Sequence, residues 1–389
     1  MAISSLLGRR IHISGSIPNN STVAQTADVE DARKLIEFLV GELMERGANF
    51  VVPVDAEKHR SHDNLPICFD WLIWESINKT LTRRPTQAQN PLVIAVQHHK
   101  NEEQIPEQFL PLWDEMRKSD LVKIESAAHW NMASKRMEMQ AHWGDILITV
   151  GGSEGVLFLA NLYHDAGKPV IPLNLPLCSS DTGSRRLFDF GLSSTHTQRL
   201  FRVDDEGTDA HTWLNRINFR SRDTLQDKSK QIIGLLEALE RPHAFVVRLL
   251  NDKHDDYEDV QNFFDTIAQP VIENELGYKT IIIDGEKPFE HAFIVNDIFS
   301  KLHRSSVVFA DITGVRPNCF IELGYALGRS IPTMLMARES TNHPFDITVF
   351  SGHHWKTKGP VQERKQAFRT HWNAIKNRPP IVPTEPLIP

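Results

Sequence analysis

The stretch that decides the fold is DILITVGGSEG, residues 145–155. Its apolar first half predicts a strand that ends at Val150, and its glycines predict a loop that leads directly into a helix over Gly155–Ala166. A second apolar run, Pro169–Leu173, predicts the next strand. A strand, a helix and a further strand in this order indicate a parallel sheet within an α/β layer.

The same alternation occupies the chain before this stretch. Helical periodicity marks Asp28–Gly47 and a segment around Phe69–Leu81, and strands are predicted at Ile11–Ile13, Asn49–Val54, Pro91–Val96 and Leu121–Ile124. The pattern weakens over residues 180–206. A helix through Ile232 and Leu239 then ends before Arg241-Pro242, which predicts a domain boundary.

The alternation restarts after this boundary. Predicted strands cover Ala244–Leu249, Thr280–Ile283, Ser306–Ala310 and Pro332–Met336, and predicted helices cover Val260–Leu276, Phe293–Leu302 and Pro317–Leu327. The expected fold class is therefore α/β, with two Rossmann-like or flavodoxin-like domains on parallel sheets, residues 1–240 and 241–389.

Composition narrows the possible functions. The chain has 43 basic and 50 acidic residues and a net charge of -7, which argues against binding to the phosphate backbone of a nucleic acid. Its three cysteines are far apart and indicate a reducing cytoplasm. No apolar run approaches the ~18 residues of a membrane helix. The 18 histidines show no metal-ligand spacing, so we expect no metal and no other cofactor.

One carboxylate lies inside an unusually apolar helix. The segment Asn318–Gly328 is apolar nearly all round, which predicts a helix covered on several sides, and Glu322 is its only acidic residue. A carboxylate in that position must be paired, protonated or facing a cavity. It is either a structural partner of Arg316 or Arg329, or a functional group.

The glycine loop of the first domain predicts an anion site. Gly151, Gly152, Ser153, Glu154 and Gly155 join a strand to a helix N-terminus, where backbone N–H groups and the helix dipole favour phosphate. The Gly15-Ser16 turn after the first strand should lie beside this loop at the same edge of the sheet. An ordinary tight turn is the alternative.

The second domain resembles a known family. Its segment Phe320–Leu327, followed by Arg329-Ser330-Ile331-Pro332, is similar to the nucleoside 2'-deoxyribosyltransferases, and TIR-like nucleotide hydrolases share the surrounding string from Ala310. The resemblance implies that Glu322 attacks an anomeric carbon and that Asp297 is a second acidic residue. Cleavage of an N-glycosidic bond passes through an oxocarbenium-like state, which such carboxylates stabilise. A surface or helix-capping role is the alternative for Asp297.

The chain departs from the transferases just before Glu322. Where they carry another aspartate, it offers Arg316, Pro317 and Asn318, while Asp311 ends the preceding strand. A basic Arg316 suits a phosphorylated substrate such as a nucleotide or NAD, although a solvated loop charge is the alternative. We predict that Asp311, Arg316 and Asn318 bind the substrate.

The first domain resembles the SLOG/LOG-like Rossmannoid family. The resemblance rests on Ile13–Ser16, the glycine loop and Ala166–Pro172. Phosphoribohydrolase members carry a catalytic glutamate after the loop, where this chain has Phe158 or Leu159. The resemblance therefore implies a domain that binds a nucleotide-derived signal, such as an ADP-ribose-type ligand, without hydrolysing it.

Together the two resemblances imply a cytoplasmic, homo-oligomeric effector of bacterial antiviral defence. In this interpretation a nucleotide signal activates an N-glycosidase that cleaves a nucleotide, with NAD as one candidate. Two alternatives stay open: a nucleotide-binding regulatory protein without catalysis, and a nucleoside 2'-deoxyribosyltransferase.

Overall fold

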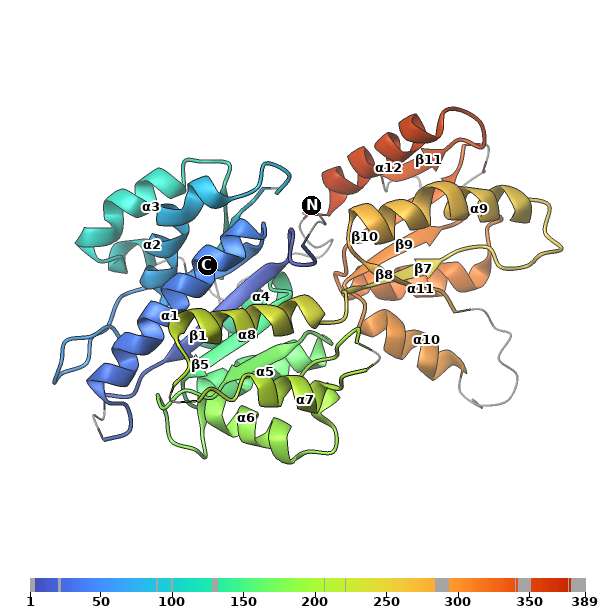
Figure 1. The fold of residues 1–389 in the computed structure, drawn as a ribbon. Coiled ribbons are helices and arrows are strands. Elements are labelled where there is room, and N and C mark those ends of the chain that lie inside the picture. The colour runs from blue at the N-terminus through green and yellow to red at the C-terminus, as the bar shows by residue number, and fades with distance from the viewer. Residues whose placement is uncertain are drawn as a thin grey trace. The chain divides into compact units, whose positions relative to one another are not determined.

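The computed structural model describes residues 4–19, 22–88, 90–98, 101–127, 132–205, 207–220, 222–283, 294–339, 341, 351–376 and 378. The chain divides into two compact units, Met1–Glu240 and Arg241–Glu385. Each unit has its own sheet and its own hydrophobic core (Figure 1).

The first unit is built on a parallel sheet with the order β4-β3-β2-β1-β5-β6. Its strands are β1 (Arg10–Ser16), β2 (Asn49–Val54), β3 (Val93–His98), β4 (Val122–Ala127), β5 (Ile146–Gly151) and β6 (Val170–Leu173). Every residue of β2, β5 and β6 is buried, as expected for parallel strands that are covered on both faces.

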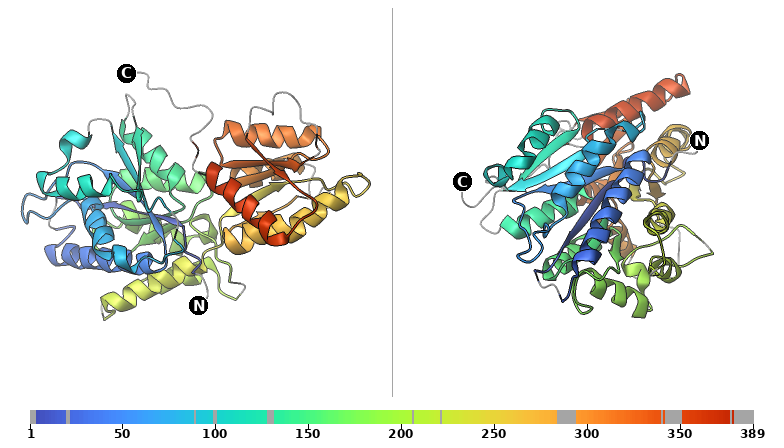
Figure 2. Two further views of the ribbon diagram at one scale, coloured as in Figure 1. Left: turned by 90° about the horizontal axis from the view of Figure 1, so that it is seen from above. Right: turned by 60° about the vertical axis from the view of Figure 1, so that its left-hand side comes forward.

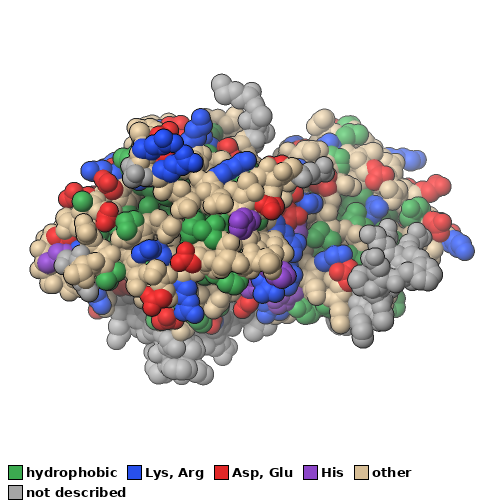
Figure 3. All heavy atoms as spheres, turned by 60° about the horizontal axis from the view of Figure 1, so that its bottom comes forward, with side chains coloured by type: hydrophobic (Ala, Val, Ile, Leu, Met, Phe, Trp, Pro, Cys, Tyr) green, Lys and Arg blue, Asp and Glu red, His purple; other side chains and the backbone are tan. Residues whose placement is uncertain are grey.

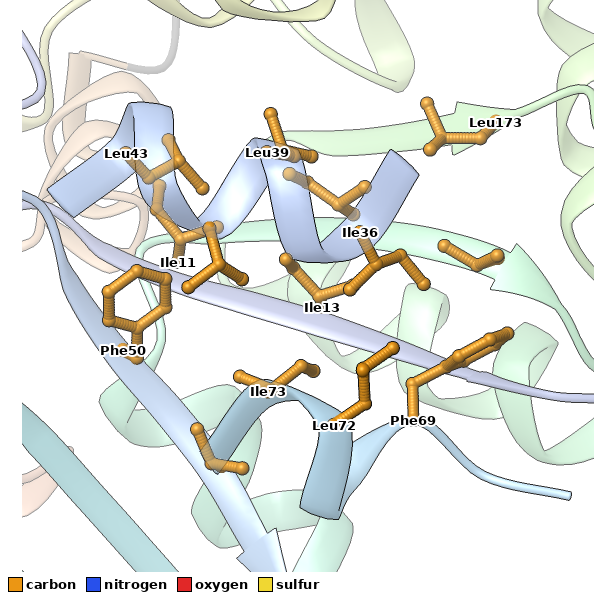
Figure 4. Packing of buried hydrophobic residues seen from close by; sticks show 14 of the residues in the cluster. Ile11, Ile13, Ile36, Leu39, Leu43, Phe50, Phe69, Leu72, Ile73 and Leu173 are labelled. Atoms are coloured by element: carbon orange, nitrogen blue, oxygen red, sulfur yellow. The ribbon is translucent and has the colours of Figure 1, made fainter. Parts of the chain in front are cut away.

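Helices cover both faces of this sheet. They are α1 (Thr26–Glu45), α2 (Asp70–Thr80), α3 (Leu110–Met116), α4 (Met132–Trp143), α5 (Glu154–Asp165), α6 (Gly183–Ser193), α7 (Ala210–Arg216) and α8 (Leu225–Ala238). The main core joins one sheet face to α1 and α2, and Figure 4 shows Ile36 and Leu39 of α1 against Ile13 of β1. On the other face α5 covers Leu147 and α4 places Trp143 against Val51.

The second unit has a five-stranded parallel sheet with the order β11-β10-β9-β7-β8. Its strands are β7 (His243–Val247), β8 (Lys279–Ile281), β9 (Val307–Asp311), β10 (Thr333–Arg338) and β11 (Gly352–Trp355), and its helices are α9 (Tyr257–Phe263), α10 (Ile294–His303), α11 (Pro317–Gly328) and α12 (Val361–Ile375). Helix α9 continues in wide π turns to Glu275. In Figure 2 (left), α9 and α12 lie on one side of this sheet and the orange helices α10 and α11 on the other.

The predicted fold class is confirmed, because both sheets are parallel and alternate with helices. The strand predicted at Asn49–Val54 matches β2 residue for residue, and the helix predicted over Val260–Leu276 is the continuous helix that begins at Tyr257. The sequence interpretation missed α3, α4, α6, α7, β11 and α12. Over the described residues, no helix is long and apolar enough to cross a membrane.

Candidate functional site

The strand order of the second unit reverses its direction between β7 and β9. The chain begins in β7, adds β8 on one side, and then adds β9, β10 and β11 on the other. The loops after β7 and β9 therefore lead away in opposite directions at the carboxyl ends of two adjacent strands. In open α/β sheets such a switch point is where ligands bind.

The loop after β9 is held in a strained conformation. Residues 312–316 connect β9 to α11, and the N–H of Val315 donates to the carbonyl of Ile312 at 3.0 Å. Gly314 has a φ of 82°, as required at the third position of a type II turn. Val315 has a φ of 45°, which is rare for a β-branched residue. Strain of this kind is often found at ligand sites.

The side chain of Asp311 fixes the position of this loop through two hydrogen bonds. Its side chain is fully buried, and it accepts a hydrogen bond from the N–H of Thr313 at 3.0 Å and one from the indole of Trp355 at 2.6 Å. Burial raises the pKa of Asp311 to about 6, against the lowering effect of these donors. The predicted substrate contact is thus a carboxylate that ties the loop to β11 in this structure.

Glu322 lies on α11 and is half-buried. Burial raises the pKa of Glu322, and the nearby guanidinium of Arg316 opposes that rise. Arg316 is half-buried where the loop meets the helix, and Asn318 is exposed in the first turn. The structure therefore brings a carboxylate and a cation together at the switch point, with a small polar side chain beside them.

The expectation that α11 is covered on several sides is wrong. Only Cys319, Leu323 and Ala326 are buried, and Ile321 keeps 62% of its surface exposed. The helix packs one face on the sheet and turns an apolar face outward. Glu322 lies between these two faces, so that solvent and small molecules can reach it.

Asp297 lies in the first turn of α10 and forms an ion pair with Lys301 at 2.7 Å. Farther along α10, Phe299 packs against Tyr325 of α11 with ring centroids 5.0 Å apart. Both helices run opposite to the strands and hence parallel to each other. Asp297 and Glu322 each precede that aromatic contact, so that they lie toward the same end of the helix pair.

The first unit has its switch point between β1 and β5, where the sequence placed the glycine loop. The N–H of Gly152 donates to the carbonyl of Ser16 at 2.6 Å, which brings the two predicted segments together. A Cβ on Gly15 would stand 1.8 Å from the carbonyl oxygen of Val150, so only glycine fits there. Gly151 and Gly152 have φ values of 61° and 80°.

The outer part of this loop is accessible. Ser153, Glu154 and Gly155 are exposed, and the side chain of Ser153 makes no capping hydrogen bond to α5. Phe158 is exposed and Leu159 is buried at the positions where phosphoribohydrolases carry their glutamate. The glycine loop thus joins β5 to the N-terminus of α5, and neither Phe158 nor Leu159 supplies the glutamate of the phosphoribohydrolases.

The sequence interpretation missed an ionisable cluster beside this loop. Cys68 pairs with Ser16 in an antiparallel bridge, and Asp70 begins α2 two residues later. Arg136 of α4 forms an ion pair with Asp55, which follows β2. Burial raises the pKa of Asp70 to about 7; Arg136 lowers it and Asp55 raises it further. In the sequence, Asp70 looks like an ordinary first-turn aspartate, since only the fold brings these groups together.

Charged side chains of both signs are scattered over both units on the face drawn in Figure 3. Within the described ranges, no group of three or more His, Cys, Asp or Glu side chains could hold a metal ion.

Comparison with known proteins gives one family. The family model described as "ATP nucleosidase Cap17-like, N-terminal" matches residues 6–236, which lie within the first unit. None of the curated proteins matches the chain. The X-ray structure of TM1055, a structural genomics target, shares 13% identity over 49% of this chain and 88% of that chain, with a TM-score of 0.29. At that TM-score the similarity does not bear on the site.

Proposed function

The chain belongs to the Cap17-like ATP nucleosidase family, as the match to its N-terminal model shows, and from this premise we propose that it hydrolyses the N-glycosidic bond of a nucleotide. ATP is the first candidate substrate because the description of the family names it, and NAD is the second. The proposed setting is bacterial antiviral defence, in line with the family resemblances of both domains.

One observation carries the assignment of the catalytic group. Glu322 is a half-buried carboxylate at a switch point, its pKa is raised by burial, and Arg316 lies beside it. Perturbed carboxylates in clefts are frequent among catalytic groups. Structural carboxylates, by contrast, are usually covered and saturated with donors, as Asp311 is here.

The proposed reaction consumes one water molecule and releases a free base. The bond between C1′ and the base breaks with its electron pair moving to the base, and the carboxylate of Glu322 forms an ester with C1′ or stabilises its positive charge. Water then supplies the hydroxyl on C1′, and its proton goes to the base. Asp297 is the proposed proton carrier, in which role it must exchange its ion pair with Lys301. Arg316 and Asn318 hold the substrate, and Asp311 positions their loop.

The first unit is the proposed sensor. Gly15, Ser16, Gly151, Gly152, Ser153, Glu154 and Gly155 would bind a nucleotide-derived signal of the ADP-ribose type. Ser153 offers its free hydroxyl, and the inner glycines allow the backbone to approach a phosphate closely. Activation through assembly into a homo-oligomer is part of the same proposal.

A second location for the reaction deserves a test, because the family match ends at residue 236 and does not include Glu322. Asp70 is the carboxylate that favours it: its pKa is raised to about 7 and it lies near the glycine loop. In this alternative the first unit performs the chemistry.

The experiment is a search for base release by the full chain. Purified protein is incubated with ATP, NAD and deoxynucleosides, with and without ADP-ribose-type ligands, and free bases are followed by chromatography. Glu322→Gln is compared with Glu363→Gln, an exposed carboxylate on α12 as a matched control. Release by wild type and the control, but not by Glu322→Gln, supports the proposal. Tight nucleotide binding without release under every condition favours a regulatory protein, and release only with an acceptor base favours a transferase.

A further inference from the structure

A histidine after β7 lies against the loop after β9 in the second unit. His254 lies between β7 and α9, and its Nδ1 accepts a hydrogen bond from the N–H of Asp256 at 3.1 Å. In the neutral ring this bond assigns the proton to Nε2. Nε2 is therefore a hydrogen-bond donor whose orientation is fixed by the backbone.

The edge of the ring that carries Nε2 lies against the loop after β9. A Cβ on Gly314 would stand 3.1 Å from Cε1 and 3.1 Å from Nε2 of His254. Gly314 precedes Arg316 by two residues, so that the imidazole and the guanidinium flank one short turn. About one third of the His254 side chain is exposed.

Both loops are fixed by Arg338 at the end of β10. Its guanidinium forms ion pairs with Asp256 and with Asp259, the latter at 2.7 Å. Its backbone N–H donates to the hydroxyl of Thr313 at 2.9 Å. One residue thus holds the turn that carries His254 and the turn that carries Gly314, so that contacts within the protein fix the two turns relative to each other.

The guanidinium of Arg316 makes few hydrogen bonds to the described residues. Among the described residues, its Nη2 has one hydrogen-bond partner, the carbonyl of Asp311 at a long 3.4 Å. Its Nε is buried and has no hydrogen-bond partner in the described part of the chain. The guanidinium of Arg316 therefore keeps donors that a bound anion would satisfy.

We propose that Nε2 of His254 and the guanidinium of Arg316 bind the phosphate group of the substrate. This inference rests on the proposed function and assigns the phosphate of that nucleotide to two residues, so that free nucleosides should bind poorly. Glu322 lies five residues beyond Pro317, or about 7.5 Å along α11. A phosphate held at the turn would therefore leave the sugar close to the carboxylate.

The test is an NMR titration of the full chain labelled at the histidine Cε1 positions. The His254→Gln variant identifies the signal, and the Glu322→Gln background prevents turnover. ATP and inorganic tripolyphosphate are expected to shift the His254 signal, and adenosine is not. Arg316→Gln is expected to weaken this response at least about tenfold, as for the loss of a charged hydrogen bond. Lys253→Ala, which removes an exposed neighbouring charge, should change it less than threefold.

A His254 signal that stays still under saturating ATP, or that moves equally with adenosine, overturns the inference. Failure of the proposed function is distinguishable, since it would appear as no base release by the wild type, or as full release by Glu322→Gln protein, whether or not the His254 signal responds to ATP. In the wild-type background, His254→Asn should raise KM for ATP about tenfold with kcat nearly unchanged. His254→Gln, which can place a donor near the position of Nε2, should restore part of that loss. An equal loss in both variants would contradict a role for the donor.

Discussion

Replacing Trp355 by phenylalanine removes one donor to the buried carboxylate of Asp311. The indole donates to Oδ2 at 2.6 Å, while its ring stacks on Phe263 with centroids 4.4 Å apart, a contact that phenylalanine can keep. A hydrogen bond to a charged acceptor stabilises by about 1.5–3 kcal/mol and one to a neutral acceptor by about 0.5–1.5 kcal/mol. Because the hydrogen bond to a charged carboxylate is the stronger one, its loss destabilises the protein more at a pH where Asp311 is ionised.

The direction of this pH dependence follows from the pKa of Asp311. Its folded value of about 6 lies above the unfolded value of 3.8, so that its contribution to stability is fully present below 3.8 and is lost as pH rises through 6. Loss of the donor raises the folded pKa further, so the additional cost appears above pH 6. Trp355→Phe should therefore destabilise the second unit by about 1 kcal/mol more at pH 8 than at pH 4.5.

The assay is urea unfolding at both pH values, followed by hydrogen exchange in peptides from β9 and β10, which report on the second unit. Trp372→Phe is the matched control. It is also buried and packs on Phe309, so its cost should be independent of pH. Equal costs of Trp355→Phe at pH 4.5 and 8 would refute the assigned role of the Asp311 carboxylate.

Three further predictions concern single residues. Gly314→Ala should cost about 1 kcal/mol in unfolding free energy because its φ is 82°, and should raise KM for ATP several-fold by displacing His254; unchanged kinetics would remove the glycine from the site. Gly15→Ala should destabilise the first unit by about 3 kcal/mol, seen as a lower thermal midpoint, because its Cβ would overlap the Val150 carbonyl; an unchanged midpoint would contradict the observed strand spacing. Asp70→Asn should raise the thermal midpoint at pH 8 but not at pH 5. The reason is that the contribution of a carboxyl group with a raised pKa to stability is lost as pH rises through about 7. Equal effects at both pH values would show that burial does not raise the pKa of Asp70.

The parallel sheets were predictable because their strands are short apolar runs between helical segments. The stretch DILITVGGSEG placed β5 and the glycine loop correctly, and the Gly15-Ser16 turn does lie beside that loop. Helix α12 was overlooked although Phe368, Trp372 and Ile375 are buried at helical spacing. Its other residues are mostly polar, so the apolar stripe is narrow.

The surroundings of the candidate carboxylates were less predictable. Apolar composition suggested that α11 is covered on several sides, but Ile321, Gly324 and Gly328 lie on an exposed side. The raised pKa of Asp70 depends on Asp55 and Arg136, which come from distant segments. The approach of His254 to Gly314 likewise depends on two loops that only the sheet order brings together.

Adenine release from ATP by the full chain decides whether Glu322 is the catalytic carboxylate. Wild type, Glu322→Gln and Asp70→Asn are measured side by side, and ATP binding is recorded for each preparation. We expect Glu322→Gln to lose at least about 100-fold in turnover while it still binds ATP, and Asp70→Asn to keep most of its turnover. Full turnover in Glu322→Gln protein, with loss in Asp70→Asn, would refute the role of Glu322 and place the chemistry in the first unit.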